Sequence, residues 1–179
     1  LQFPQLKVER MGSTTHTAKQ YLTNGLADLS FLCAVKPSSL LEYVPLLHDT
    51  LCLAVPESMI SAEIRAGGLA ACGCLPFVLP DEQQFGRELV DRLFRREHLY
   101  PISLYTAAGW KDLVRLADEG YGAAILPERS AARLEHCEVL PLENAPSFDF
   151  VCAVPRYAEP SPACMALIEL AWKHFATHG

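Results

Sequence analysis

Short apolar runs alternate along this chain with segments whose apolar residues recur at helical spacing. The apolar runs predict strands at 6–11, 27–35, 50–55, 75–79, 102–105, 122–126, 138–142 and 148–154. Several of these runs are apolar throughout, which is typical of parallel strands covered on both faces. Strands that alternate with helices predict an α/β fold with a parallel sheet and right-handed crossovers.

Three helices have the clearest pattern. In 85–97 the apolar residues form one stripe and the charged residues lie mostly outside it, as expected for a helix with one solvated face. The segment 110–119 carries a similar stripe and stops at Gly120, a residue type that commonly ends helices. In 161–177 the apolar positions recur at helical spacing from Cys164 onward, which predicts a third amphipathic helix.

Composition narrows the class of protein. With 179 residues, 50 % of them hydrophobic and 20 % charged, the chain can bury a core, which excludes intrinsic disorder. No apolar run approaches the ~20 residues that span a bilayer, so no membrane partner is expected. The formal net charge of −6 argues against direct contact with nucleic acid, because phosphate binding needs a clustered positive face.

The cysteines suggest where the protein resides. There are seven, an odd number, and most lie inside apolar runs such as LCLAV and FVCAV, which indicates buried thiols. An odd count without a secretory leader indicates a reducing, cytoplasmic location. Because the chain opens with LQFPQLKVER, we interpret it as a fragment of a longer protein.

Three strand-to-helix turns contain the candidate ligand-binding residues. In the first, MGSTTHT, Ser13, Thr14 and Thr15 precede a helix predicted over 15–24. Their hydroxyls and the N–H groups of the helix start can hold an anion. The alternative is structural: one of these residues is simply the N-cap of the helix. Taken by itself, the motif favours this alternative.

The second and third turns lie in PDEQQFG and AAGWKD. In the second turn, Gln84 and Phe85 offer an amide and an aromatic wall, while Asp81 or Glu82 is expected to cap the following helix. In the third, Trp110 lies at the helix start, where packing is a more common role for a tryptophan than ligand binding.

Motifs for catalysis are absent from the sequence. It contains no GxSxG, HExxH or GxxxxGK[ST] motif and no pair of CxxC units. The Gly-x-Gly at 120–122 follows a helix and precedes a strand, the reverse of the order that dinucleotide binding requires. Two interpretations of Cys72 and Cys74 stay open: they form half of a metal site or a redox pair, or they are two structural thiols. We therefore predict no catalytic residue, no metal and no cofactor.

Taken in order, these segments resemble the effector-binding domain of LysR-type transcriptional regulators. The matching segments are FPQLKVERMGS, YLTNGLADLSFL, LLHDTLCLAVPES, LPFVLP, WKDLVRLADEGYGAAILPE and FVCAVPR. The resemblance runs over essentially the whole chain. It implies an α/β, type 2 periplasmic-binding-protein fold with two Rossmann-like lobes joined by two crossover strands. Lobe I is expected at 1–49 plus 147–179 and lobe II at 50–146.

The resemblance also implies what lies outside this sequence. The first strand and helix of the domain are expected to precede Leu1, with residues 1–5 as the tail of that helix. The DNA-binding helix-turn-helix is expected to be absent, so that DNA is contacted only through that missing N-terminal domain. The family further implies a homodimer or homotetramer.

The same resemblance implies that a small effector binds in the cleft between the lobes and acts allosterically. The predicted ligand-binding residues are Ser13, Thr14, Thr15, Gln84, Phe85 and Trp110. Effectors of the family are often small carboxylates. Because Asp81 and Glu82 precede one helix and the three turns hold no arginine, either these acids are turned outward or the effector is neutral or carries an amine. Among a carboxylate, an amine and a neutral aromatic compound, we expect an effector less anionic than the usual carboxylates.

Three alternatives stay open at this point. A solute-binding protein of a transporter would share the fold but predicts a signal peptide and few thiols. An enzyme on a related fold would need an acid–base pair, and none stands out by its spacing. A thiol-based redox-sensing regulator would depend on Cys72 and Cys74.

Overall fold

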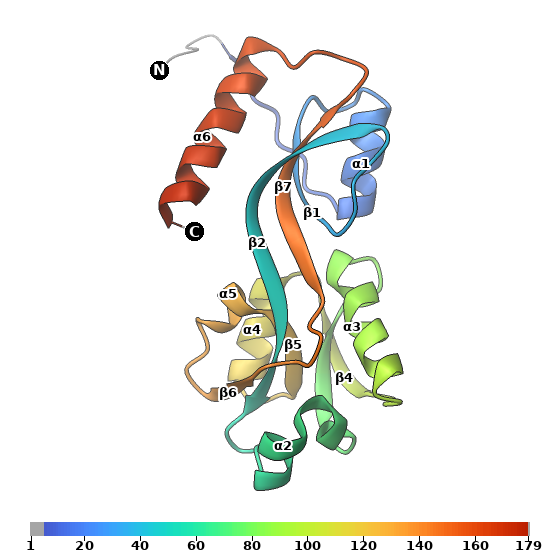
Figure 1. Cartoon of the computed structure of the whole chain (residues 1–179), viewed down its shortest axis with the longest axis vertical. Helices are drawn as coiled ribbons and strands as arrows, with labels where there is room; N and C mark the ends of the chain where they lie inside the picture. Colours follow the sequence, from blue (N-terminus) through green and yellow to red (C-terminus); the bar gives the residue numbers. More distant parts are fainter. Residues whose placement is uncertain (1–5, 179) are drawn as a thin grey trace. The chain divides into compact units, whose positions relative to one another are not determined.

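The computed structural model describes residues 6–178 and divides into two compact units. Unit 1 is Leu1–His48 with Phe148–Gly179, and unit 2 is Asp49–Ser147. The chain passes from one unit to the other inside two strands, β2 (Leu41–Pro56) and β7 (Ser147–Pro155) (Figure 1). Unit 1 combines an antiparallel strand pair with helices, and unit 2 a mixed sheet with helices, which confirms the predicted α/β class.

Unit 1 contains the helices α1 (Thr15–Thr23) and α6 (Pro162–His178) and the strand β1 (Ser30–Ala34), which pairs antiparallel with β7. Successive residues of a strand point to opposite faces of the sheet. Val151 therefore packs with Leu22 and Leu32 on the α1 side, while Cys152 packs with Ile168 on the α6 side. The two faces of one short ribbon thus form two small cores.

Unit 2 is built on a larger sheet in the order β2-β5-β3-β4, with β6 also paired to β2. The strands are β3 (Pro76–Pro80), β4 (Ile102–Ala107), β5 (Ala123–Pro127) and β6 (Cys137–Leu140). The helices are α2 (Ala62–Gly67), α3 (Phe85–Arg96), α4 (Trp110–Asp118) and α5 (Glu128–Ala131), with a 3-10 helix, η1, over Gly68–Cys72. The predicted helices at 85–97 and 110–119 are confirmed.

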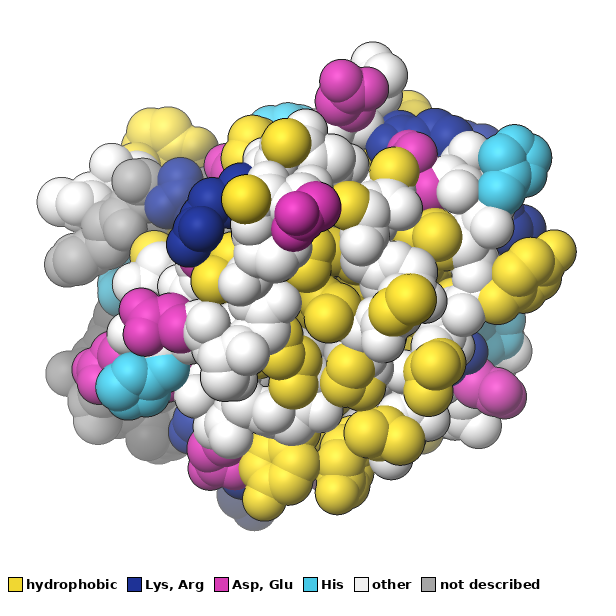
Figure 2. All heavy atoms as spheres, turned by 90° about the horizontal axis from the view of Figure 1, so that it is seen from below, with side chains coloured by type: hydrophobic (Ala, Val, Ile, Leu, Met, Phe, Trp, Pro, Cys, Tyr) yellow, Lys and Arg dark blue, Asp and Glu magenta, His cyan; other side chains and the backbone are white. Residues whose placement is uncertain are grey.

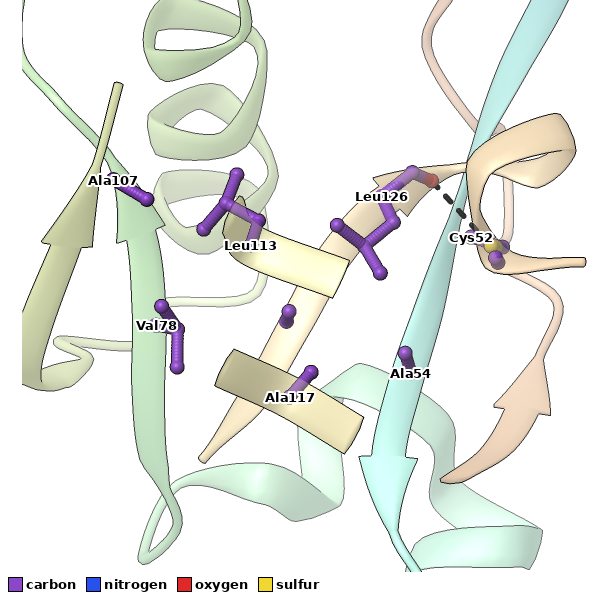
Figure 3. Packing of buried hydrophobic residues seen from close by; sticks show 9 residues of the cluster. Cys52, Ala54, Val78, Ala107, Leu113, Ala117 and Leu126 are labelled. Carbon is purple, nitrogen blue, oxygen red and sulfur yellow. Dashed lines mark hydrogen bonds between the residues drawn. The ribbon is translucent and has the colours of Figure 1, made fainter. Parts of the chain in front are cut away.

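The core of unit 2 is made of small and branched side chains from β2, β3, β5 and α4. Val78, Leu113 and Leu126 are almost completely buried in it, and the Cys52 thiol donates a hydrogen bond to the Leu126 carbonyl oxygen at 3.4 Å (Figure 3). The position of α4 against the sheet is set by Leu113 and Ala117, one turn apart on the same face. This packing fixes the start of α4, where Trp110 lies.

Two predictions about the strands are wrong. The sheet is not parallel throughout: β3 runs parallel to β4 and β5, but β2 runs antiparallel to β5 and β6, and β1 antiparallel to β7. Burial on both faces makes an antiparallel strand as continuously apolar as a parallel one, so the pattern did not distinguish them. The predicted strand at 6–11 is not formed either. Leu6 and Val8 are 50 % and 74 % exposed, and this segment pairs with no strand of the described residues.

Glycine ends two of the helices, as predicted for Gly120. Gly25 and Gly120 follow α1 and α4 with φ of 69° and 81°, the left-handed region that a glycine occupies without a steric penalty.

The expected helix tail at residues 1–5 lies outside the described residues. Within 6–178, no helix is both long and apolar enough to cross a bilayer.

Candidate ligand-binding turns

The parallel strands of unit 2 bring two of the predicted turns together. β3 and β4 are neighbours, so the helices that follow them, α3 and α4, begin at the same edge of the sheet. A backbone hydrogen bond from the Asp81 N–H to the Ala107 carbonyl, 2.9 Å long, joins the two turns directly. The structure therefore places Gln84, Phe85 and Trp110 around adjacent helix starts.

Trp110 packs directly against the first turn of α3. A Cβ atom added to Gly86 would lie 2.0 Å from Cη2 of the Trp110 indole, far inside van der Waals contact. The indole is half-buried and also contacts the core cluster of unit 2. The expected packing role of Trp110 is confirmed. A side chain at position 86 would force the Trp110 ring to move away from the helix backbone.

The starts of α3 and α4 have no side-chain cap. The N-cap residues are Gln84 and Gly109, and neither makes a side-chain hydrogen bond to its helix. The expected cap by Asp81 or Glu82 is wrong, because the Gln84 N–H donates to the Asp81 carbonyl and this turn delays the helix start. First-turn N–H groups of a helix have no intrahelical acceptor and carry a partial positive charge. Two such starts side by side form an edge rich in backbone donors.

The charged side chains near this edge are mostly acidic, with Glu88 and Asp112 in the first turns of α3 and α4, and the arginine is already engaged. Arg87 lies in the first turn of α3, but its guanidinium donates to the Pro80 carbonyl at 3.0 Å and to Asp91 at 2.9 Å. Glu82 and Lys111 are exposed and Asp81 is half-buried. Each of these two turns thus combines backbone N–H donors, an aromatic side chain and at least one carboxylate.

The first predicted turn belongs to unit 1. Thr14 is the N-cap of α1: its Oγ1 accepts a hydrogen bond from the Thr17 N–H at 3.3 Å and lies 3.2 Å from the Thr17 hydroxyl. The capping interpretation of this motif is therefore confirmed for Thr14. Ser13 is exposed and Thr15 is half-buried as the first helical residue.

One buried carboxyl group was missed by the sequence interpretation. Asp49, 7 % exposed, is the one buried charged residue of the described part of the chain, and it accepts a hydrogen bond from the Thr50 N–H at 2.9 Å. Burial raises the pKa of Asp49 above its ordinary value, while the N–H groups of Thr50 and Arg129 act in the opposite direction. The sequence signal for this buried carboxyl group was a single acidic residue next to the apolar run LCLAV.

The thiol alternative gains no support from the geometry of Cys72. Its Sγ is buried and donates to the Gly68 carbonyl oxygen at 3.3 Å, and burial raises its pKa to about 11. Cys74 is exposed, and both are free thiols. Within residues 6–178, no group of three or more His, Cys, Asp or Glu residues is arranged to hold a metal ion.

Two hollows lie away from the predicted turns. One, of about 550 Å³, is in unit 1 between β2 and α6 and is lined by Val44, Ile168 and Trp172 among others. The other, of about 340 Å³, is in unit 2 and is lined by Cys52, Glu128 and Val139 with neighbours. Neither hollow is lined by a predicted ligand-binding residue.

Several solved structures share this fold. The effector binding domain of QuiR, solved in complex with shikimate, is 22 % identical with a TM-score of 0.71, over 93 % of this chain and 80 % of that one. The regulatory domain of CcmR from Synechocystis PCC6803, in complex with 2-PG, is 15 % identical with a TM-score of 0.75, over 97 % and 86 %. Full-length CbnR complexed with its target DNA is 19 % identical with a TM-score of 0.64, over 91 % and 57 %.

These similarities define the class of the fold, a mixed α/β, periplasmic-binding-protein-like architecture. The family follows from the sequence. The model of the LysR substrate binding domain matches residues 1–176, and the chain belongs to that family. No curated protein matches the chain significantly.

Proposed function

We propose that the chain is the effector-sensing domain of a LysR-type transcriptional regulator and that it binds a small molecule without converting it. The observation that carries this proposal is the pair of adjacent helix starts in unit 2. Both lack a side-chain cap, and the aromatic surfaces of Phe85 and Trp110 lie beside them. Backbone donors next to apolar walls are typical of small-molecule sites.

The proposed ligand-binding residues are Ser13, Thr14 and Thr15 in unit 1 and Gln84, Phe85 and Trp110 in unit 2. Thr14 already caps α1, so we assign the ligand contact of that turn first to the exposed Ser13 hydroxyl. In unit 2, Gln84 offers a half-buried amide that does not cap α3. The proposal includes that one ligand contacts both the Ser13 turn of unit 1 and the Gln84 turn of unit 2.

The proposed effector is an amine or a neutral aromatic compound rather than a simple carboxylate. QuiR and CcmR were solved in complex with shikimate and 2-PG, respectively. Here the helix starts would favour an anion, but Asp81 and Glu82 precede α3 and the nearby Arg87 is held by Pro80 and Asp91. A ligand that donates a hydrogen bond to an acid and stacks on an aromatic ring fits this combination better.

The proposed mechanism is allosteric. An effector shifts the equilibrium between two arrangements of the domain only by its differential affinity for them, typically ~1–3 kcal/mol. We propose that this shift is passed to a second copy in a homodimer or homotetramer and to a DNA-binding domain outside this sequence, as full-length CbnR binds its target DNA. A cytoplasmic location without membrane contact completes the proposal.

A thermal-shift screen tests this proposal. The chain is heated with simple benzoates, small amines and neutral aromatic compounds, each in excess. A ligand at 100 times its Kd stabilises the folded state by roughly 2.7 kcal/mol. We expect some of the amines or neutral aromatic compounds to bind. Gln84→Ala should weaken this binding, whereas Gln83→Ala, at an exposed neighbouring position, should leave it unchanged. Turnover of the compounds, or binding only of benzoates, would contradict the proposal.

A further inference from the structure

The hollow of unit 2 lies where a very short helix leaves part of a sheet uncovered. Alternate residues of a strand share one face, so Cys52 and Ala54 of β2 both point into the core cluster. Val139 of β6 is the register partner of Ala54 and therefore lies on that same face. α5 covers the face with Ala131 but is only four residues long, and Val139 stays 43 % exposed. The uncovered part of the face is the hollow.

The walls of this hollow are apolar apart from one acidic side chain. They enclose about 340 Å³ and are formed by Cys52, Glu128, Ala131, Ala132, Val139 and Pro141. Ligand sites of proteins commonly measure about 300–1,000 Å³ and combine apolar walls with a few polar groups. The hollow lies at the small end of that range, so it fits a compact ligand.

Glu128 gives the hollow a negative rim. It is exposed at the first position of α5, and no ion pair holds its carboxylate among the residues that the structure describes, whereas Glu119 and Glu138 are each paired with an arginine. Burial raises the pKa of the Cys52 thiol to about 12, and the charges of Glu128 and Asp49 act in the same direction. The negative charge of the rim therefore acts at the floor of the hollow.

Asp49, the second acid near the hollow, already has its partners. Its carboxylate accepts hydrogen bonds from the backbone N–H groups of Thr50 and Arg129, and the charge of the Arg129 side chain also acts on it. The Glu128 carboxylate accepts no hydrogen bond from the described part of the chain. Of the two acids, Glu128 is thus the one that is available to a ligand.

We infer that this hollow is a second ligand site and that it takes a small ammonium compound with a compact apolar body. The ammonium group lies at Glu128, because hydrogen bonds between a cation and a carboxylate are the strong ones. The apolar body contacts Val139 and Pro141 and covers the face that α5 leaves open. A carboxylate ligand of the same shape is repelled by Glu128, and a neutral one lacks the ionic contact.

Apolar surface alone does not distinguish this site. Hydrophobic side chains also gather at the α2 end of unit 2, which Figure 2 views, but most charged side chains there lie toward the margin. The hollow differs because a carboxylate stands directly beside its apolar walls. None of its lining residues belongs to the proposed effector turns, so the inference does not rest on the proposed function.

Chemical-shift mapping with three matched compounds tests the inference. Cyclohexylammonium, cyclohexanol and cyclohexanecarboxylate share one ring and differ in charge, and each is titrated into ¹⁵N-labelled chain. We expect cyclohexylammonium to shift the amides of Glu128, Ala132 and Val139 with a single Kd. Cyclohexanol should bind there at least about 3-fold more weakly, and cyclohexanecarboxylate should leave these amides unshifted.

Two charge-removing variants complete the test. Glu128→Gln should raise the Kd of cyclohexylammonium at least about 3-fold. Glu135→Gln, at an exposed acid outside the hollow, should leave that Kd unchanged. Equal shifts by the ammonium and the carboxylate, no shift at the hollow, or an unchanged Kd in Glu128→Gln would overturn the inference. The amides of Phe85 and Gly86 report the effector site separately, so failure of this inference and failure of effector binding are distinguishable.

Discussion

The indole of Trp110 packs on the backbone of Gly86, so that the start of α4 contacts the first turn of α3. A Cβ at position 86 would lie 2.0 Å from Cη2 and 2.4 Å from Cζ2 of that ring. Both residues are held by the same sheet, since α3 and α4 follow the paired strands β3 and β4. This contact fixes the two helix starts that the proposed site uses.

Substituting Gly86 with alanine tests that contact. Because the new methyl group overlaps the indole, we expect Gly86→Ala to lower the free energy of unfolding by about 1–3 kcal/mol. Urea denaturation measures the change. Gly12→Ala serves as the control, since a Cβ there meets nothing within 4 Å. The double variant Gly86→Ala, Trp110→Phe should lose less stability than the sum of the single changes. Strict additivity would argue against direct contact.

Removal of the α1 cap is expected to have a separate, local effect. Thr14→Ala deletes the hydroxyl that accepts the Thr17 N–H, and loss of such a cap costs about 1 kcal/mol. Thr14→Ser keeps the oxygen and should retain most of the stability. Equal stability of Thr14→Ala and the wild type in thermal unfolding would show that this cap does not stabilise α1.

Asp49 gives the domain a defined dependence on pH. Burial raises its folded-state pKa above the unfolded value, so the folded state binds more protons in the interval between the two. The stability contributed by protonated Asp49 is present below the unfolded pKa and is lost as pH rises through the folded pKa. The unfolding free energy of the wild type minus that of Asp49→Asn should therefore fall from acidic to neutral pH. A difference that rises with pH would contradict this assignment.

Thiol labelling distinguishes a structural from a redox role of Cys72. Burial raises the pKa of Cys72 to about 11, and of Cys52 and Cys152 to about 12. Since the thiolate is the reactive form, these thiols should react slowly with iodoacetamide in the folded protein at pH 8, and the exposed Cys74 rapidly. Mass spectrometry of digested, labelled protein gives the order. Rapid labelling of Cys72 would restore the redox alternative.

The sequence predicted the parts of this fold that depend on local pattern. The helices at 85–97 and 110–119 carry long apolar stripes, and both are present as α3 and α4. α5 is four residues long and η1 is a five-residue 3-10 helix, too short to leave a periodic signal. The predicted strand at 50–55 missed the first part of β2, from Leu41, which contains Pro45 and polar residues.

Features that depend on distant residues could not be predicted. Strand direction is set by which strands become neighbours, so the antiparallel pairing of β1 with β7 leaves no local trace. The segment 6–11 has a strand pattern but no pairing among the described residues. Likewise, nothing near Gly86 in the sequence indicates that Trp110 packs on it. The ligand-binding assignment of the six predicted residues remains a prediction.

Chemical-shift mapping tests the central proposal most directly. A compound identified in the thermal-shift screen is titrated into ¹⁵N-labelled chain, and amide shifts are followed residue by residue. The proposal predicts that the amides of Ser13, Phe85 and Gly86 and the indole N–H of Trp110 shift together and saturate with one Kd. Shifts confined to the hollow beside Val44 and Trp172, or no shift at either helix start of unit 2, would contradict it.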